Sequence, residues 1–348
     1  LPICVVIARS LAIGAVGGTA AFFIGIPLAW MLGPLLVTMV LSLSGVEAKI
    51  PRPLSDIFKG VVGILLGTAI TPETLHRLVD WPMSLLIVVL GLLVVSSGVG
   101  LFYHRLCGFD RITAAAASLP GSINAIPAIA IGLGADAQRT ILPQLLRVAL
   151  VVTCVPPIYL MWQGQAGAVA LPGQSGSGMD WLGEGLWVVL IAPVGWWIAR
   201  RIRLPVPQLL GPMVVAAGAS LLGVTVALPD WLTALTFLVL GTGIGARFHN
   251  MRLRTLFGTG RHALTGTLLT FFGVGLTGLA IHQVTGVALP VALLAVVPGG
   301  IAEMALLATA LGVDPVFVTF HQVLRSILLN SIAPFVFQWA VRDQPPIV

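Results

Sequence analysis

The feature that most constrains this chain is an internal duplication: a shift of 178 residues aligns the sequence with itself, without gaps, from Pro27 to Pro156. Many of the matches are glycines, prolines, amides and charged residues, which a shared apolar composition alone would not place in one register. They include Leu32-Gly33-Pro34 on Leu210-Gly211-Pro212, Gly63 and Gly67 on Gly241 and Gly245, Pro120-Gly121 on Pro298-Gly299, and Gln144 and Arg147 on Gln322 and Arg325. We predict two membrane repeats, residues 1–162 and 179–343, joined by a Gly-rich linker at 163–178.

Composition decides what surrounds these repeats. Of the 348 residues, 57% are hydrophobic and only 9% are charged, whereas a soluble domain carries about a quarter charged residues. So apolar a chain cannot keep its whole surface in water, so lipid must surround part of it. This excludes the classes of soluble enzymes and nucleic-acid-binding proteins, despite the net charge of +6. Long alternating strand segments are absent, so we predict an all-α integral membrane protein whose first partner is the bilayer.

The distribution of basic residues predicts that the two halves are inverted. Each half holds six apolar segments, and the basic connections of one half match connections with few or no basic residues in the other. Half one carries Lys49, Arg52, Arg105 and Arg111, and half two carries Arg200, Arg201, Arg203, Arg247, Arg252, Arg254 and Arg261. Since basic connections stay in the cytoplasm, the halves face opposite ways and both termini are cytoplasmic in a multi-pass protein of the bacterial inner membrane.

Inversion requires an odd number of crossings in each half, so one of the six segments must enter and leave on the same side. The fifth segment is the best candidate, because proline and glycine interrupt it at SLPGSINAIP, residues 118–127, and at VVPGGIAE, residues 296–303. The predicted fold is two inverted repeats, each with about five transmembrane helices and one broken, re-entrant segment.

The two broken segments are the candidate substrate site. Non-helical backbone at membrane depth is tolerated where protein buries it or water lines it, and half-helix N-termini there can offer N–H groups to an anion. The alternative is a packed kink without a ligand. The candidate residues are Pro120, Gly121, Ser122 and Asn124 in the first segment, and Pro298, Gly299, Gly300 and Glu303 in the second.

The sixth segment of each half adds a Gln-x-x-Arg motif, Gln144 with Arg147 and Gln322 with Arg325. This spacing places the amide and the guanidinium on one helical face, where they suit a carboxylate or phosphate of the solute. The alternative is structural: each arginine pairs with Asp136 or Asp314 or extends to an interface. For the two aspartates, capping of the helix that follows is the favoured role.

Glu303 is the coupling-ion candidate, because an ionised carboxylate in lipid must be neutralised, paired or hydrated. It would take up a proton or sodium ion during transport; the alternative is a paired structural acid, with Arg325 as the partner.

Two further patterns concern packing. Gly33-Pro34 and Gly211-Pro212 should unwind or kink the second segment of each half. Gly63-x-x-x-Gly67 and Gly241-x-x-x-Gly245 fit close helix approach, for which packing is the favoured explanation.

Catalytic chemistry finds no support in the sequence. The six histidines and three cysteines show no metal-binding spacing, and no P-loop occurs, so we expect no metal, no cofactor, no catalytic residues and no enzyme activity.

The chain resembles the AbrB-type family of bacterial inner-membrane proteins with a twofold duplicated domain. The resemblance rests on PLAWMLGPLLVTM at 27–39, LPVPQLLGPMVVAAG at 204–218, SLPGSINAI at 118–126 and VVPGGIAEMALLATALGVDP at 296–315. Members carry labels such as regulator and ammonia monooxygenase, and the resemblance implies a plasma-membrane transporter. The monooxygenase label finds no metal ligands in this chain.

These observations favour an ion-coupled secondary transporter of a small, anionic organic solute, working by alternating access between the broken helices. The alternative is a membrane sensor or regulator that binds a ligand without moving it, and a channel is a third option. No nucleic acid is expected as a partner, and association into a homo-oligomer is left open.

Overall fold

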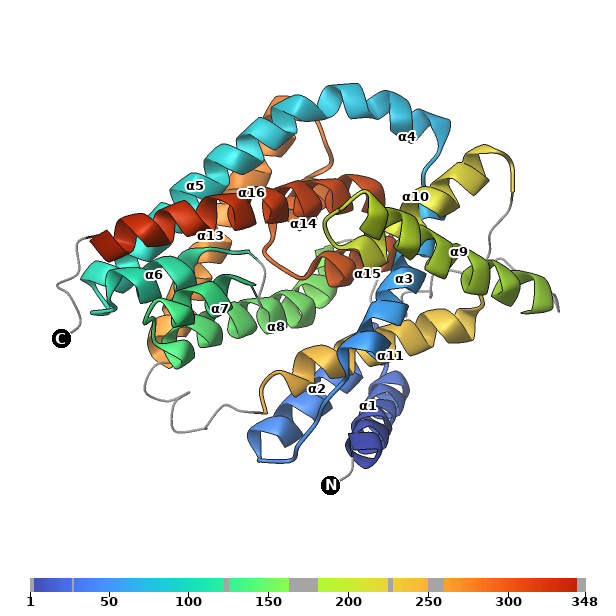
Figure 1. The fold of residues 1–348 in the computed structure, drawn as a ribbon, viewed down its shortest axis with the longest axis horizontal. Helices are drawn as coiled ribbons and strands as arrows, with labels where there is room; N and C mark the ends of the chain where they lie inside the picture. Colours follow the sequence, from blue (N-terminus) through green and yellow to red (C-terminus); the bar gives the residue numbers. More distant parts are fainter. Residues whose placement is uncertain are drawn as a thin grey trace. The chain divides into compact units, whose positions relative to one another are not determined.

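The structure is a computed structural model that describes residues 3–26, 28–121, 125–162, 181–224, 228–249 and 260–342. Within these residues the regular elements are all helices (Figure 1). Five of the helical stretches are long and apolar enough to cross a bilayer: Cys4–Ile24, Pro72–Arg105, Ala137–Tyr159, Gly260–Thr285 and Pro315–Val341. The all-α prediction is therefore confirmed for the described part of the chain.

The duplication recurs in the helix boundaries. The first half forms α1 Ile3–Ile24, α2 Ala29–Leu43, α3 Arg52–Thr68, α4 Pro72–Arg77, α5 Trp81–Arg105, α6 Arg111–Ser118, α7 Ala125–Gly132 and α8 Ala137–Trp162. The second forms α9 Trp181–Arg201, α10 Pro207–Leu221, α11 Asp230–Ala246, α13 Gly260–Thr285, α14 Leu289–Val296, α15 Ile301–Ala310 and α16 Pro315–Arg342. A shift of 178 residues carries α2, α3 and α6 onto α10, α11 and α14 at both ends.

Residues with positive φ recur at the same shift. Leu28 has φ 53° before α2, and Val206 has φ 47° before α10. A side chain with a Cβ adopts this left-handed conformation only at a cost in energy, so its repetition shows that both halves enter the second helix by the same turn. Four further pairs follow: Gly25 and Arg203, Gly45 and Gly223, Gly108 and Gly286, and Gly134 and Gly312.

The compact units of the structure mix the two halves. Unit 1 comprises Leu1–Val79, Val152–Asn250 and Ile301–Thr319, and unit 2 comprises Asp80–Val151, Met251–Gly300 and Phe320–Val348. Both α8 and α16 run from one unit into the other. This division differs from the predicted repeats 1–162 and 179–343, and the predicted linker 163–178 lies outside the described residues.

Unit 1 is built on close crossings between helices of different halves. α3 packs on α10, and α11 packs on α2. A Cβ on Gly63 would strike the carbonyl oxygen of Leu209, and a Cβ on Gly241 would strike that of Met31. Since glycine alone allows backbones to approach so closely, the packing interpretation of the Gly-x-x-x-Gly motifs is confirmed.

The Gly-Pro pairs were predicted to unwind or kink the second segments, and the structure contradicts the unwinding. Pro34 lies inside the continuous helix α2, and Pro212 lies inside α10. Each proline is the sixth residue of its helix, so it removes one hydrogen bond close to the N-terminus and the rest of the helix continues. The preceding glycines serve packing, because a Cβ on Gly33 would strike the backbone of Gly17.

Unit 2 holds α5, α6, α7, α13, α14 and most of α16, with the first part of α8. α5 packs on α13, α6 packs on α5, and α14 packs on α13. One buried cluster joins Ile112, Ala116 and Leu119 of the first broken segment to Leu329 and Phe337 of α16. The first broken segment therefore has a firm apolar support inside unit 2.

Candidate functional site

The second broken segment is interrupted where the sequence predicts it. α14 ends at Val296, Val297 has extended backbone with ψ 128°, and α15 begins at Ile301 after Pro298-Gly299-Gly300. The carbonyl groups at the end of α14 have no partner within their own helix. They lie in the protein interior, since Val296 and Val297 are buried, and so they require donors from elsewhere.

Gln322 and Arg325 of α16 supply those donors. The Gln322 side-chain amide donates to the carbonyl oxygens of Leu294 and Val297, each at 2.8 Å. Nη1 of Arg325 donates to the carbonyls of Val296 and Val297 at 3.1 and 3.0 Å. Nη2 donates to Gly299 O at 3.3 Å and to Gln322 Oε1 at 2.6 Å. The motif is thus a C-terminal cap for α14, with the cation at the negative end of the helix dipole.

The first broken segment repeats part of this arrangement. α6 ends at Ser118, and the Gln144 amide donates to the carbonyl of Ala116 at 2.9 Å. Ala116 is the mate of Leu294 at the 178-residue shift, so Gln144 and Gln322 hold equivalent carbonyls. The Cβ that glycine lacks at position 121 would meet Ile126 and Leu329, which shows how closely this segment is packed.

Arg147 and Arg325 form a buried pair of positive charges in unit 2. Each of the two residues is only 4% exposed, and their guanidinium groups repel each other electrostatically. Nε of each arginine is buried without a hydrogen-bond partner in the described part of the chain. Across the described ranges, no carboxylate forms an ion pair with either group within 4.0 Å. The pair therefore carries positive charge that the described protein does not neutralise.

The aspartates that could have paired with these arginines cap helices instead. Asp314 accepts hydrogen bonds from the backbone N–H groups of Val316 and Phe317, each at 3.0 Å. Asp136 accepts from the N–H of Arg139 at 2.9 Å and lies 3.8 Å from its side chain. The capping prediction is confirmed for both residues, at the start of α16 and of α8.

Glu303 lies in unit 1, in the first turn of α15, and is 5% exposed. Its Oε1 lies 4.0 Å from Nη2 of Arg247, a side chain that is 35% exposed. The observed charge partner of Glu303 is thus Arg247, in place of the Arg325 that the sequence suggests. The mates of Glu303 and Arg247 are Ala125 and Ala69, so this ion pair belongs to half two alone.

The remaining candidates can be placed as follows. Pro120, Gly121, Pro298, Gly299 and Gly300 lie in unit 2 together with both Gln-x-x-Arg motifs. Ser122 and Asn124 lie outside the described residues. A cavity of about 20 Å³, the size of one water, lies between Pro120, Val296 and Arg325 and brings both broken segments to one point.

Tyr103 of α5 is a residue of this site that sequence reasoning missed. It is fully buried, its hydroxyl has no hydrogen-bond partner within the described ranges, and it interacts electrostatically with Arg147. The available signal was a tyrosine inside an apolar segment, one of only two in the chain. Nothing in the sequence spacing relates it to Arg147, because the two residues lie on different helices.

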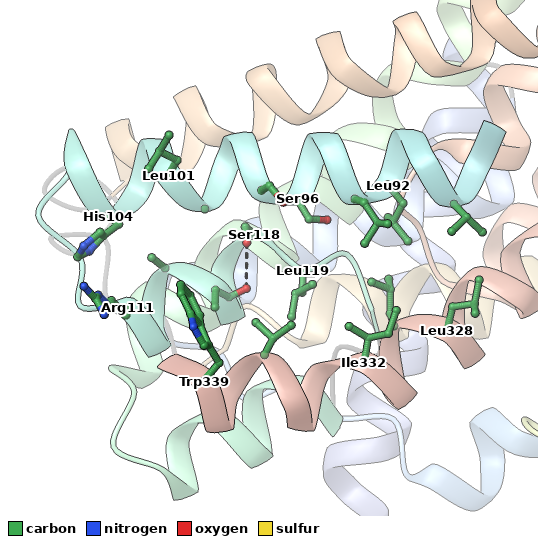
Figure 2. Close-up of a pocket in the computed structure, with 18 of the residues that line it drawn as sticks. Leu92, Ser96, Leu101, His104, Arg111, Ser118, Leu119, Leu328, Ile332 and Trp339 are labelled. Atoms are coloured by element: carbon green, nitrogen blue, oxygen red, sulfur yellow. Dashed lines mark hydrogen bonds between the residues drawn. The ribbon is translucent and has the colours of Figure 1, made fainter. Parts of the chain in front are cut away.

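A second, larger cavity of about 470 Å³ lies between α5, α6 and α16 (Figure 2). Leu92, Leu119 and Ile332 line its apolar part, and His104 and Arg111 lie at one end. Arg105, which follows His104 as the last residue of α5, also lines the cavity. Its lining also includes Ser118 and Leu119, so it reaches the first broken segment. Among the described residues, no group of three His, Cys, Asp or Glu side chains is placed to hold a metal ion.

Comparisons with known proteins give one family and two relatives. The model of the family described as transition state regulatory protein AbrB matches residues 7–341. The chain is 28% identical over 351 residues to "Uncharacterized protein YhjN" of Bacillus subtilis (strain 168), with 93% of this chain and 90% of the relative covered. It is 29% identical over 332 residues to "Putative regulator AbrB" of Escherichia coli (strain K12), with 90% and 92% covered. No solved structure matches the chain significantly.

Proposed function

The chain belongs to the AbrB family, and we propose its function from its own residues. It is a multi-pass protein of the bacterial inner membrane and an ion-coupled secondary transporter of a small organic anion. The regulator label of one relative is a name only, and it corresponds to the second candidate function considered below.

Apolar side chains on the outside of long helices support a membrane location. Phe23 of α1 is 82% exposed, Val94 of α5 is 72% exposed and Phe272 of α13 is 65% exposed. Large apolar faces of this kind are stable against lipid and costly against water. Together with the five apolar helices, they favour a chain that crosses the bilayer several times.

Inverted repeats are supported by the helix crossings of unit 1 together with the basic connections. The pairs α3·α10 and α2·α11 exchange when each helix is replaced by its mate, which is the result of a twofold axis between the halves. The basic connections favour an axis in the membrane plane, because mated connections differ in charge. Both termini are then cytoplasmic.

The single observation that carries the transport proposal is the buried pair Arg147 and Arg325. Two guanidinium groups that repel each other, each with an unpartnered Nε, call for an anion in an apolar interior. The hydroxyl of Tyr103 is a further donor close to Arg147. A carboxylate of the solute would accept these hydrogen bonds between the two broken segments.

Glu303 and Arg247 are the proposed coupling site. A proton or sodium ion at the Glu303 carboxylate would replace the charge of Arg247 and release the ion pair. Only the second broken segment carries this acid, which gives the two segments different tasks: the second couples, and both hold the solute.

The test is counterflow of labelled organic anions in proteoliposomes made from the purified full chain. The proposal expects internal unlabelled carboxylate to drive uptake of labelled carboxylate, and expects Arg147→Gln to abolish it. Arg139→Gln is the control, because that arginine is exposed and pairs with Asp136. Absence of counterflow across a broad panel of anions would overturn the proposal.

The second candidate function is a membrane sensor, favoured by the small size of the cavity at the broken segments, about 20 Å³. A sensor would bind an anion and change its thermal stability without counterflow.

A further inference from the structure

The groove between α5, α6 and α16 is long for a solute site. Its lining on α5 runs from Val89 to Arg105, a stretch that spans roughly 24 Å at the helical rise of about 1.5 Å per residue. The hydrocarbon core of a bilayer is about 30 Å thick. The groove therefore extends over more than the depth of one leaflet, and its volume of about 470 Å³ is that of a narrow channel for an extended chain.

The chemistry of the groove is polarised along this length. One end carries His104 and Arg111, with Trp339 on the same side, and the other end is formed by leucine and isoleucine side chains (Figure 2). Arg105 follows His104 at the end of α5 and also lines the groove. Basic residues and tryptophan gather where a membrane protein meets lipid headgroups, and basic residues there attract anionic lipids. A ligand with one anionic end and one apolar chain satisfies both ends of the groove.

The second half of the chain provides an internal comparison. Gly278 and Leu293 are the mates of Gly100 and Ala115 in the groove. The Leu293 side chain lies 2.7 Å from where a Cβ of Gly278 would be, so it fills the space that Ala115 leaves open. The mates of Arg105 and Arg111 are Gln283 and Leu289, which are uncharged. At these positions, half one combines the smaller Ala115 with two basic residues, whereas half two has the larger Leu293 and no basic residue.

We infer that this groove binds one anionic phospholipid, with an acyl chain along α5 and α16 and the phosphate at Arg105 and Arg111. The inference rests on the membrane location given above and is independent of transport. Because Ser118 and Leu119 line the groove, the acyl chain touches the first broken segment, and the lipid becomes a structural partner of that segment.

The experiment is native mass spectrometry of the purified full chain with phosphatidylglycerol and phosphatidylcholine of identical acyl chains. The wild type should retain phosphatidylglycerol with an about 25-fold preference, because Arg105 and Arg111 lie near the headgroup and each basic residue there contributes about fivefold. Ala115→Leu, which copies half two, should lose the retained lipid. Ser97→Trp fills the groove from an exposed position and should also lose the retained lipid. It serves as the test if Ala115→Leu folds poorly. Arg105→Gln should retain lipid and lower the preference to about fivefold, because Arg111 remains.

Ala280→Leu, which adds the same volume at an exposed position of α13, is the matched control and should bind as the wild type does. Unchanged lipid retention in both groove-filling variants would overturn the inference. A wild type that binds both lipids equally would also overturn it. If the groove-filling variants change only the oligomeric state, the groove is instead the binding site of a second copy of the chain, and the inference is overturned. Retained lipid without counterflow would reject the transporter and leave the lipid site standing.

Discussion

The two broken segments share their support and differ in their charge. In both, a glutamine from the following long helix holds a carbonyl of the preceding half-helix, Gln144 on Ala116 and Gln322 on Leu294. Only the second segment continues into an acid, Glu303, which lies beside Arg247. The repeated contacts stabilise a helix break inside the protein, and the unrepeated ion pair has no structural counterpart in half one. The glutamine contacts shared by the two segments therefore stabilise the breaks, and the ion pair found in one segment alone is the feature that distinguishes them.

The largest expected effect comes from Arg325→Ala. This change removes the Arg325 donors from the buried carbonyls of Val296 and Val297 and from the partly buried carbonyl of Gly299. It should lower the free energy of unfolding by about 3 kcal/mol or more. Equilibrium unfolding of the detergent-solubilised protein measures it. Arg139→Ala, an exposed arginine, should change stability by less than about 0.5 kcal/mol. Equal effects of the two variants would show that the cap is not needed.

Gly63→Ala tests the symmetric crossings of unit 1. The added methyl group would strike the backbone of Leu209, and overpacking of this kind costs about 2 kcal/mol. Gly241→Ala should cost the same amount, because it strikes the equivalent carbonyl of Met31. Gly60→Ala on the same helix as Gly63 meets its nearest neighbour, Ala192, at 3.6 Å and should be tolerated. If the free energies of unfolding of Gly63→Ala and Gly241→Ala differ by about 2 kcal/mol, the two crossings are not equivalent.

Glu303→Gln tests the asymmetric part. It removes the carboxylate beside Arg247, and we expect uptake driven by a proton or sodium gradient to fall about tenfold, equal to about 1.4 kcal/mol. Counterflow without a gradient should persist, because the arginine pair that holds the solute is unchanged. Gradient-driven uptake in proteoliposomes that stays at the wild-type level would remove Glu303 from coupling.

The smallest expected effect is the difference between two matched glutamine variants. Gln322→Leu removes the hydrogen bonds to the carbonyls of Leu294 and Val297 and the one that Arg325 donates to Gln322 Oε1, whereas Gln144→Leu removes the one to the carbonyl of Ala116. Since each lost hydrogen bond costs about 1 kcal/mol and Arg325 still donates to Val297, Gln322→Leu should be the more destabilising variant by about 1 kcal/mol. Thermal unfolding of the two proteins side by side measures the difference, and a larger loss from Gln144→Leu would contradict the hydrogen-bond assignment.

Much of the fold was predictable because the duplication and the apolar segments can be read directly from the order of residues along the chain. The breaks at Pro120-Gly121 and Pro298-Gly299 and the caps at Asp136 and Asp314 follow from the chemistry of single residues. The contacts that build the site are non-local. Spacing along the chain does not encode these contacts, because they depend on how separate helices pack. They are the cap that Arg325 forms on α14, the ion pair of Arg247 with Glu303, and the proximity of Tyr103 to Arg147. Gly33-Pro34 does not unwind its helix because Pro34 falls near the helix start, where one lost hydrogen bond is tolerated.

Everything proposed for transport depends on the halves facing opposite sides of the membrane, and cysteine labelling measures this directly. Arg52 and Asp230 are mates at the starts of α3 and α11, and both are exposed. In a chain whose three cysteines are replaced by serine, Arg52→Cys should react with a membrane-impermeant maleimide only from the cytoplasmic side. Asp230→Cys should react only from the opposite side. Labelling of both positions from the same side would contradict the inverted repeat and the site built on it.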